Sequence, residues 1–142
     1  MYSVKKCLLI DDDPDDHELF ALAVESIDRS VHCSFAKDGL YGLELLEESG
    51  TQLPDVIFLD LNMPRMGGKE CLHTIRSVRA YDHIPVVILT TSVNRFDQVD
   101  TLAGGAVDFI TKPSRTAEFV AELKRVFEKL SMRSMAANCK RD

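Results

Sequence analysis

The sequence predicts an α/β fold, a doubly wound (βα)5 domain built on a five-stranded parallel sheet. Short apolar runs alternate five times with longer segments whose apolar residues recur at helical spacing, and neither an internal repeat nor a linker interrupts them. Strands that alternate with helices form parallel sheets, because each helix returns the chain to the edge at which the previous strand began. The strand order 2-1-3-4-5 is a common solution for five strands, and we expect it here.

The first two strand–helix units are marked by apolar runs and a proline. Residues 4–10 predict the first strand, and Pro14 predicts a helix over residues 14–26, since proline favours the first helical turn. Residues 31–36 predict the second strand, and residues 39–48 predict the second helix. The side chains expected to face the core from these helices are Leu19, Phe20, Ala23, Val24, Ile27, Leu40, Leu43 and Leu46.

The remaining three units follow the same pattern. The predicted strands are residues 56–59, 85–89 and 107–110, and the predicted helices are residues 69–79, 95–103 and 116–130. The last helix has the clearest apolar stripe, and the helix over 95–103 has a weaker one. We therefore expect residues 1–130 to form one domain and the polar residues 131–142 to form a short, frayed C-terminal tail.

Composition and charge exclude several functional classes. A chain of 142 residues with 45% hydrophobic and 28% charged residues is typical of one soluble globular domain. The net charge of −6, without a dense Lys/Arg cluster, argues against nucleic acid or an anionic membrane as a partner. No apolar run approaches the length of a membrane span, and the N-terminal segment turns acidic too soon for a signal peptide. We expect a cytoplasmic protein.

Four cysteines, Cys7, Cys33, Cys71 and Cys139, are scattered without C-x-x-C spacing. Because cytosolic disulfides are rare, we expect separate reduced thiols. Cys7 and Cys33 fall on strands that could be neighbours, so a contact between them is compatible with the predicted sheet. The four histidines do not cluster at the spacing of metal ligands.

Three consecutive acids, Asp11, Asp12 and Asp13, lie between the first predicted strand and Pro14. Open α/β sheets bind ligands at the carboxyl ends of their strands, and like charges this close repel unless a cation or a proton compensates them. Asp13 is best explained as the N-cap of the helix that Pro14 begins. This leaves Asp11 and Asp12 to face a metal site. The acids that the helix dipole favours in the first turn are Asp15, Asp16 and Glu18.

Three further strand ends carry groups of complementary chemistry. Asp60 follows the third predicted strand, Thr90 and Thr91 follow the fourth, and Lys112 follows the fifth. Clustered carboxylates supply the hard oxygen ligands that Mg²⁺ prefers, and a carboxylate can also act as the nucleophile toward a phosphoryl group. A hydroxyl and an ammonium group on the opposite side can stabilise the remaining phosphoryl oxygens. The predicted sheet edge therefore suits Mg²⁺-dependent phosphoryl transfer.

These groups occur in four segments, LLIDDDP, DVIFLDLNMPRMGG, PVVILTTS and DFITKPS. Together the segments resemble the receiver domain of response regulators in two-component signalling, over roughly residues 4–130. The resemblance implies a flavodoxin-like fold and a switch that a sensor histidine kinase or a phosphotransfer protein phosphorylates. The runs DDDPDDHELF and LDLNMPRMGGKE are especially similar to stand-alone bacterial receivers, some of which serve phytochrome-type kinases.

The resemblance also implies a role for each site residue. Asp60 corresponds to the phosphoacceptor. Asp12 corresponds to a direct Mg²⁺ ligand, Asp11 to a ligand that acts mainly through water, and Asn62 to the residue whose backbone carbonyl completes the protein ligands.

The switch residues follow in the same way. Thr90 corresponds to the hydroxyl that moves toward the phosphoryl group, and Lys112 to the cation that contacts it. The aromatic residue of the coupled switch is Phe109, where many relatives carry tyrosine, so a hydrogen bond from that ring is not expected. Asn62 and Ser92 occupy positions that tune the lifetime of the phosphoryl group in this family.

Two alternatives remain at this point. A phosphohydrolase with haloacid-dehalogenase-like chemistry also uses an aspartyl-phosphate, but it usually carries a second acid two residues after the nucleophile and places the nucleophile on the first strand. Asn62 occupies that position here, and Asp60 follows the third strand. A DNA-binding regulator would need an effector domain. We therefore expect a phosphoacceptor switch that is not a turnover enzyme, with an unknown downstream protein target and the capacity for a homodimer.

Overall fold

The computed structural model describes residues 2–141, with side chains as far as residue 136. Within these residues the strands β1 (Lys6–Ile10), β2 (His32–Ala36), β3 (Val56–Leu59), β4 (Val86–Thr90) and β5 (Asp108–Thr111) form one sheet. All neighbouring strands are parallel, in the order β2-β1-β3-β4-β5. The predicted fold class and strand order are confirmed.

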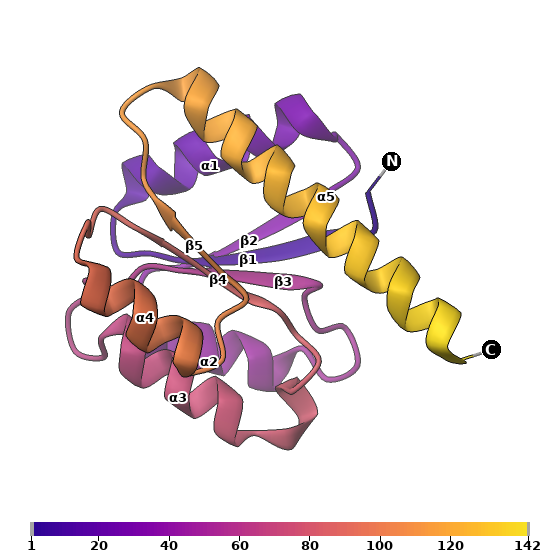
Figure 1. The fold of residues 1–142 in the computed structure, drawn as a ribbon. Helices are drawn as coiled ribbons and strands as arrows, with labels where there is room; N and C mark the ends of the chain where they lie inside the picture. The colour runs from indigo at the N-terminus through magenta and orange to yellow at the C-terminus, as the bar shows by residue number, and fades with distance from the viewer. Residues whose placement is uncertain (1, 142) are drawn as a thin grey trace.

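Helices cover both faces of the sheet (Figure 1). The helices α1 (Pro14–Ile27) and α5 (Thr116–Arg141) lie on one face, and α2 (Gly39–Glu48), α3 (Gly68–Ser77) and α4 (Arg95–Ala103) lie on the other. A single 3-10 turn, η1 (Arg79–Tyr81), follows α3. None of the helices within residues 2–141 combines the length and apolar character needed to cross a membrane.

Two helix ends differ from the sequence prediction by more than one residue. The predicted helix over 69–79 already ends at Ser77, because Val78 adopts an extended backbone (φ −96°, ψ 113°) before the 3-10 turn. The last helix does not end at residue 130 but continues to Arg141, so the expectation of a frayed tail is wrong for residues 131–141. Helix-forming residues such as Met, Ala and Arg dominate this extension, and no Gly or Pro interrupts it.

Each face of the sheet has its own apolar core, because successive side chains of a strand point to opposite faces. The core under α1 and α5 centres on three buried rings, Phe20, Phe58 and Phe127. The rings of Phe20 and Phe58 meet edge to face, with centroids 5.0 Å apart. The core on the other face contains Leu8 and Ile10 of β1 together with buried side chains of α2 and α3.

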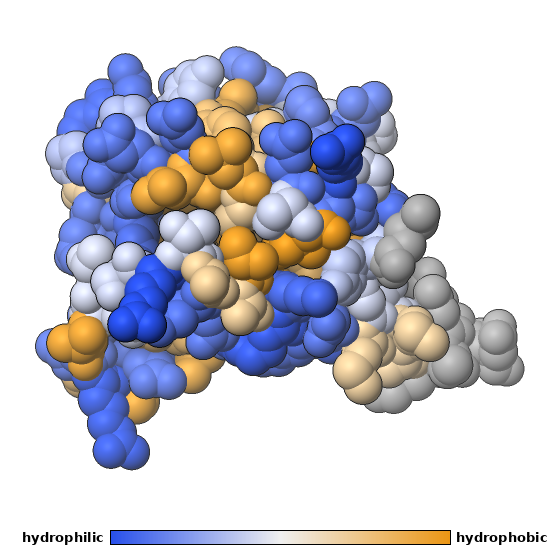
Figure 2. Space-filling view, turned by 90° about the horizontal axis from the view of Figure 1, so that it is seen from above, coloured by the Kyte–Doolittle hydropathy of each residue, from blue (hydrophilic) through white to orange (hydrophobic). Residues whose placement is uncertain are grey.

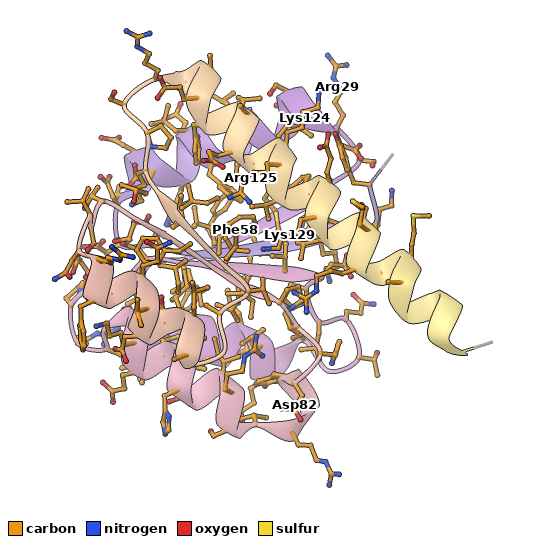
Figure 3. All side chains as sticks on the ribbon, viewed as in Figure 1. Arg29, Phe58, Asp82, Lys124, Arg125 and Lys129 are labelled. Carbon is orange, nitrogen blue, oxygen red and sulfur yellow. The ribbon has the colours of Figure 1, made fainter. Side chains whose placement is uncertain are left out.

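Helix α5 is also held to the sheet by charge. The Arg125 guanidinium lies 2.8 Å from the carboxylate of Asp108 on β5, and the Lys129 ammonium lies 3.1 Å from the same oxygen. Both basic side chains project from α5 (Figure 3). Burial acts to raise the pKa of Asp108, but the two cations outweigh it and lower that pKa below its ordinary value.

Some residues predicted to face the core are exposed. Leu19 is 50% exposed and Leu40 is 41% exposed. The buried faces of α1 and α2 are formed by other residues, which include Phe20, Ala23 and Leu46. The face formed by α1 and α5, where Leu19 and Leu22 are exposed, carries a group of apolar side chains (Figure 2). On α4 the apolar residues Phe96, Val99 and Leu102 are also exposed. The helix is present, but the prediction that its apolar stripe packs into the core is wrong.

Asp38, the N-cap of α2, links helix capping to the stability of the fold at low pH. Asp38 is 4% exposed, accepts a hydrogen bond of 2.8 Å from the Tyr41 N–H and pairs with the Arg65 guanidinium. These two donors hold the pKa of Asp38 below its ordinary value of about 3.9. The stabilisation is complete above that ordinary value and is lost as the pH falls through the lowered one.

We expect Asp38→Ala to lower the free energy of unfolding by about 1 kcal/mol at neutral pH, whereas Asp38→Asn keeps the cap and removes only the charge. Urea unfolding at about pH 7 and about pH 3 checks this. The wild type should lose more stability between the two pH values than Asp38→Asn does. An equal loss in both proteins would contradict the role of the carboxylate.

Candidate functional site

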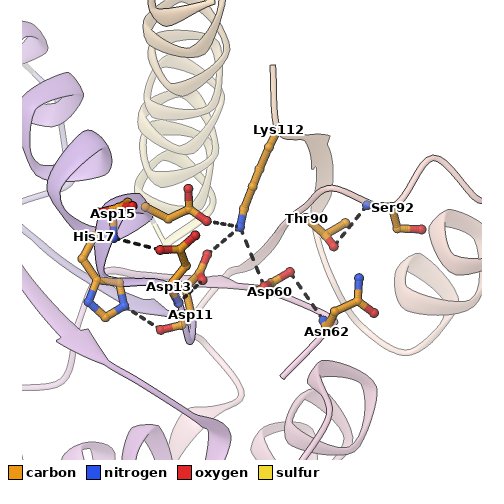
Figure 4. Close-up of polar contacts among 10 residues, drawn as sticks. Asp11, Asp13, Asp15, His17, Asp60, Asn62, Thr90, Ser92 and Lys112 are labelled. Carbon is orange, nitrogen blue, oxygen red and sulfur yellow. Dashed lines mark hydrogen bonds and ion pairs between the residues drawn. The ribbon is translucent and has the colours of Figure 1, made fainter. Parts of the chain in front are cut away.

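The site lies at the carboxyl edge of the sheet, where strand pairing brings distant residues together. Ile10 pairs with Leu59, so Asp11 and Asp60, which follow them, lie side by side. The Asp60 N–H also donates to the Ile10 carbonyl at 2.9 Å. At the next pair of strands, the Lys112 N–H donates to the carbonyl of Thr90 at 2.7 Å. The predicted meeting of these four strand ends is therefore present (Figure 4).

Three carboxylates converge at this edge. The oxygens of Asp11, Asp12 and Asp60 include one from each residue within 4.8 Å of one another, and within residues 2–136 no histidine or cysteine joins such a group. Asp11 is 0% exposed, Asp60 is 5% exposed and Asp12 is open to solvent. Hard oxygen ligands with one accessible side fit a divalent cation that keeps part of its water shell.

The three consecutive acids, Asp11, Asp12 and Asp13, have different roles, as their chemistry predicts. The side chain of Asp13 accepts the Asp15 N–H at 2.9 Å, which makes Asp13 the N-cap of α1. The Asp13 N–H in turn donates to the carboxylate of Asp11 at 3.0 Å. Asp13 thus begins the helix and orients Asp11, while Asp11 and Asp12 face the site.

Lys112 is the cation that balances these acids. Its Nζ lies 2.7 Å from Asp11, 2.7 Å from Asp16 and 3.7 Å from Asp60. Burial acts to lower the pKa of Lys112, but the bonds to Asp11 and Asp16 raise it above its ordinary value. Burial raises the pKa of Asp11, and Lys112 together with the Asp13 N–H opposes this rise. An ammonium ion in this position balances the negative charge of the buried Asp11.

Two contacts at the site go beyond the sequence prediction. Asp16 was assigned to the helix dipole, but its carboxylate also binds Lys112. Asp16 precedes the buried Phe20 by one helical turn, so the phase of α1 could have placed it on the sheet side. The second contact joins His17 Nε2 to the Asp11 carbonyl at 2.6 Å, with the imidazole ring stacked on Phe35.

The remaining predicted residues surround Asp60. Asn62 lies beside it, and its N–H points to the Asp60 carboxylate at 3.5 Å. Thr90 is 0% exposed, and its hydroxyl oxygen accepts the Ser92 N–H at 3.3 Å. Phe109 is half-buried against the core on the α2 and α3 side. Thr91 instead of Thr90 lines the open depression of about 400 Å³ above the acids.

A family model for the response regulator receiver domain matches residues 7–124. The chain belongs to this family. The match begins within β1, includes the other four strands and reaches into α5, so the receiver fold and its place in two-component signalling agree with the site.

Several solved receivers are similar over nearly their whole length. The phosphorylated cyanobacterial phytochrome response regulator RcpA is 28% identical with a TM-score of 0.80, and the alignment covers 93% of this chain and 96% of RcpA. The Mn²⁺-bound response regulator Rcp1 is 27% identical with a TM-score of 0.76, covering 86% of this chain and 91% of Rcp1.

A curated relative is much longer. The hybrid signal transduction histidine kinase D of Dictyostelium discoideum is 30% identical over 116 residues, which are 82% of this chain but only 7% of that kinase. The similarity therefore concerns a receiver-sized part of the kinase and not its remaining activities. With the receiver family shown, the phosphohydrolase alternative is not favoured.

Proposed function

We propose that this receiver is a phosphoacceptor switch in which Asp60 takes a phosphoryl group from a sensor histidine kinase or a phosphotransfer protein. The observation that carries the proposal is the Lys112 ammonium, which binds the buried Asp11 at 2.7 Å and faces Asp60 at 3.7 Å. One cation after β5 and three carboxylates, two after β1 and one after β3, form a site whose charge can be rearranged when a phosphoryl group arrives.

Asp60 is the group that reacts. A carboxylate oxygen of Asp60 attacks phosphorus, a P–O bond forms, and the P–N bond to the donor histidine breaks with both electrons going to nitrogen. Asp60 opens to the depression that Asp12 and Asn62 also line, so a donor can approach it from solvent.

Mg²⁺ is the cofactor that we propose for the carboxylate cluster. Asp12 and Asp60 would bind it directly, Asp11 mainly through water, and Asn62 through its backbone carbonyl. When bound there, the ion would neutralise the phosphoryl oxygens during transfer. The Mn²⁺ of the similar Rcp1 structure supports a divalent ion at this kind of site.

Thr90 and Lys112 respond to the negative charge of the phosphoryl group on Asp60. Lys112 has three carboxylates within reach and can turn from Asp11 and Asp16 toward a phosphoryl group on Asp60. The Thr90 hydroxyl donates to the same group from the end of β4. Both movements alter the loop between β4 and α4, and the half-buried Phe109 follows by repacking.

Contacts of the β4–α4 loop support this route. The Ser92 hydroxyl donates to Asp97 at 2.6 Å, and Lys69, at the start of α3, lies 2.7 Å from the same residue. Lys69 also lies 3.0 Å from Asp100 and 4.8 Å above the Phe96 ring. A shift of the loop is thereby coupled to α3 and α4, and the exposed apolar side chains of α4 offer a surface to a downstream protein or a second copy.

Asn62 supports a switch over a turnover enzyme. Its amide has no proton to exchange as a general acid or base near neutral pH, so nothing at this position is suited to rapid hydrolysis of the acyl phosphate. We further propose that residues 1–130 form the receiver, that the segment 131–142 extends it, and that the protein acts in the cytoplasm by protein contact or phosphorelay.

The direct test is labelling with a small phosphoryl donor. Incubated with acetyl phosphate and Mg²⁺, the protein should gain one phosphoryl group that hydroxylamine removes, and borohydride reduction followed by peptide mapping should locate it at Asp60. Rapid multiple turnover of a small phosphate ester would instead support the phosphohydrolase alternative.

Two neighbouring acids allow a matched test of the metal. Asp12→Asn should weaken Mg²⁺ binding about tenfold or more, because a charged oxygen ligand is lost. Asp13→Asn should leave Mg²⁺ affinity nearly unchanged, since Asn also caps a helix. Isothermal titration calorimetry measures both. Equal losses in the two variants would remove Asp12 from the proposed ligand set.

A further inference from the structure

Two cysteines face each other across the edge of the sheet. Cys7 on β1 and Cys33 on β2 are register partners, and their sulfur atoms lie 3.3 Å apart. Neighbouring strands lie about 4.8 Å apart, and disulfides form across Cα separations of about 4.4–6.8 Å. Because the partners are already aligned, bringing the sulfurs from 3.3 Å to a bonded distance of about 2.0 Å requires little backbone movement.

The two thiols differ in environment. Cys7 is 1% exposed, whereas Cys33 is partly exposed on β2, which is an edge strand. The two sulfurs share a hydrogen bond in which either can be the donor. This contact lowers the pKa of Cys33 and, together with burial, raises the pKa of Cys7. Cys33 is therefore the thiol with the lower pKa and the one that meets solvent.

We propose that Cys7 and Cys33 form a reversible disulfide when the protein meets a hydroperoxide. The Cys33 thiolate attacks the peroxide, a S–O bond forms, the O–O bond breaks, and the leaving oxygen takes a proton, which gives a sulfenic acid. The Cys7 sulfur then attacks the Cys33 sulfur, the S–S bond forms, and the S–O bond breaks with release of water. The two sulfurs lose two electrons in all, and the peroxide gains them.

Cys71 provides an internal contrast. It is 0% exposed on α3, in the core on the opposite face of the sheet from Cys7 and Cys33. Burial raises the pKa of Cys71 to about 12, and within residues 2–136 no second sulfur lies in bonding contact with it. The chemistry is thus expected at one pair of thiols and not at buried thiols in general.

The consequence is a covalent tie between β1 and β2. The linked residues are separated by 26 positions in sequence, so the bond would close a loop containing the whole of α1. This loop also carries Asp11 and Asp12 of the proposed site but not the proposed phosphoacceptor Asp60, and the cysteines contact none of these acids. The redox pair is therefore independent of the proposed phosphorylation.

The experiment uses the full chain carrying Cys139→Ser, so that the fourth thiol cannot form mixed disulfides. The protein is treated with hydrogen peroxide, denatured, alkylated and digested with trypsin. Cleavage after Lys6, Arg29 and Lys37 leaves Cys7 in peptide 7–29 and Cys33 in peptide 30–37. We expect these peptides to be linked, with the mass of two hydrogens lost, and dithiothreitol to separate them.

Variants in which one further cysteine is replaced show which thiol reacts in each of the two steps. Cys71→Ser should form the link as efficiently as the parent, and Cys33→Ser should not form it. Cys7→Ser should leave a sulfenic acid at Cys33 that dimedone traps. The proposal is overturned if both peptides remain fully alkylated in the parent protein after peroxide, or if the link joins Cys71 instead. The parent digest alone decides this, even if a variant folds poorly.

Discussion

Replacing Asp60 by asparagine should abolish phosphorylation of this receiver by acetyl phosphate and by any cognate kinase. The amide of the variant has the size of the carboxylate but is not a nucleophile toward phosphorus, so labelling should fall to the background of the assay. Phosphate incorporation measured by intact mass at several Mg²⁺ concentrations checks this.

The loss should not come from unfolding. Asp60 lies in the group of three carboxylates with Asp11 and Asp12, so removal of its charge relieves repulsion while Lys112 keeps its bonds to Asp11 and Asp16. We expect the free energy of unfolding to change by less than about 1 kcal/mol. Asp16→Asn is the matched control, because it neutralises another acid at Lys112 but keeps the acceptor. Persistent labelling of Asp60→Asn would place the acceptor elsewhere.

Much of the site could be predicted because strand ends carry distinctive chemistry. Asp11, Asp60, Thr90 and Lys112 each follow a short apolar run, and parallel topology requires all such ends to meet at one edge. Capping logic also separated Asp13 from the other acids, and the Asp15 N–H bond confirms it. Residue type and topology were sufficient for these positions.

Other features depended on helix phase and packing, which composition does not specify. Asp16 reaches Lys112 because it shares the inner face of α1 with Phe20, a relation that a simple count of acids in the first turn overlooks. Leu19 and Leu40 match core spacing but lie outside the buried line. Whether a thiol at Cys7 meets one at Cys33 depended on strand register, which periodicity alone does not fix.

The second large effect that we expect is a loss of stability when a side chain is added at Gly68, after the loop that follows Asp60. Gly68 begins α3 where the helix approaches the backbone of the acceptor strand. A Cβ at Gly68 would lie 2.2 Å from the Asp60 carbonyl oxygen and 2.6 Å from the Leu61 Cα, both of which are backbone atoms. The Gly68 N–H also donates to the Leu61 carbonyl at 2.9 Å, so the helix cannot withdraw without losing that bond.

Gly68→Ala should therefore lower the free energy of unfolding by about 3 kcal/mol and slow the phosphorylation of Asp60, because the peptide that presents the carboxylate must move. Gly67→Ala is a control one residue away: its Cβ would meet only the Leu61 carbonyl oxygen at 3.7 Å, and its φ of −68° suits any residue. That variant should stay within about 0.5 kcal/mol of the wild type. Urea unfolding and labelling rates for the pair measure both effects. If the two alanines behaved alike, close contact between α3 and the acceptor loop would not be what requires glycine here.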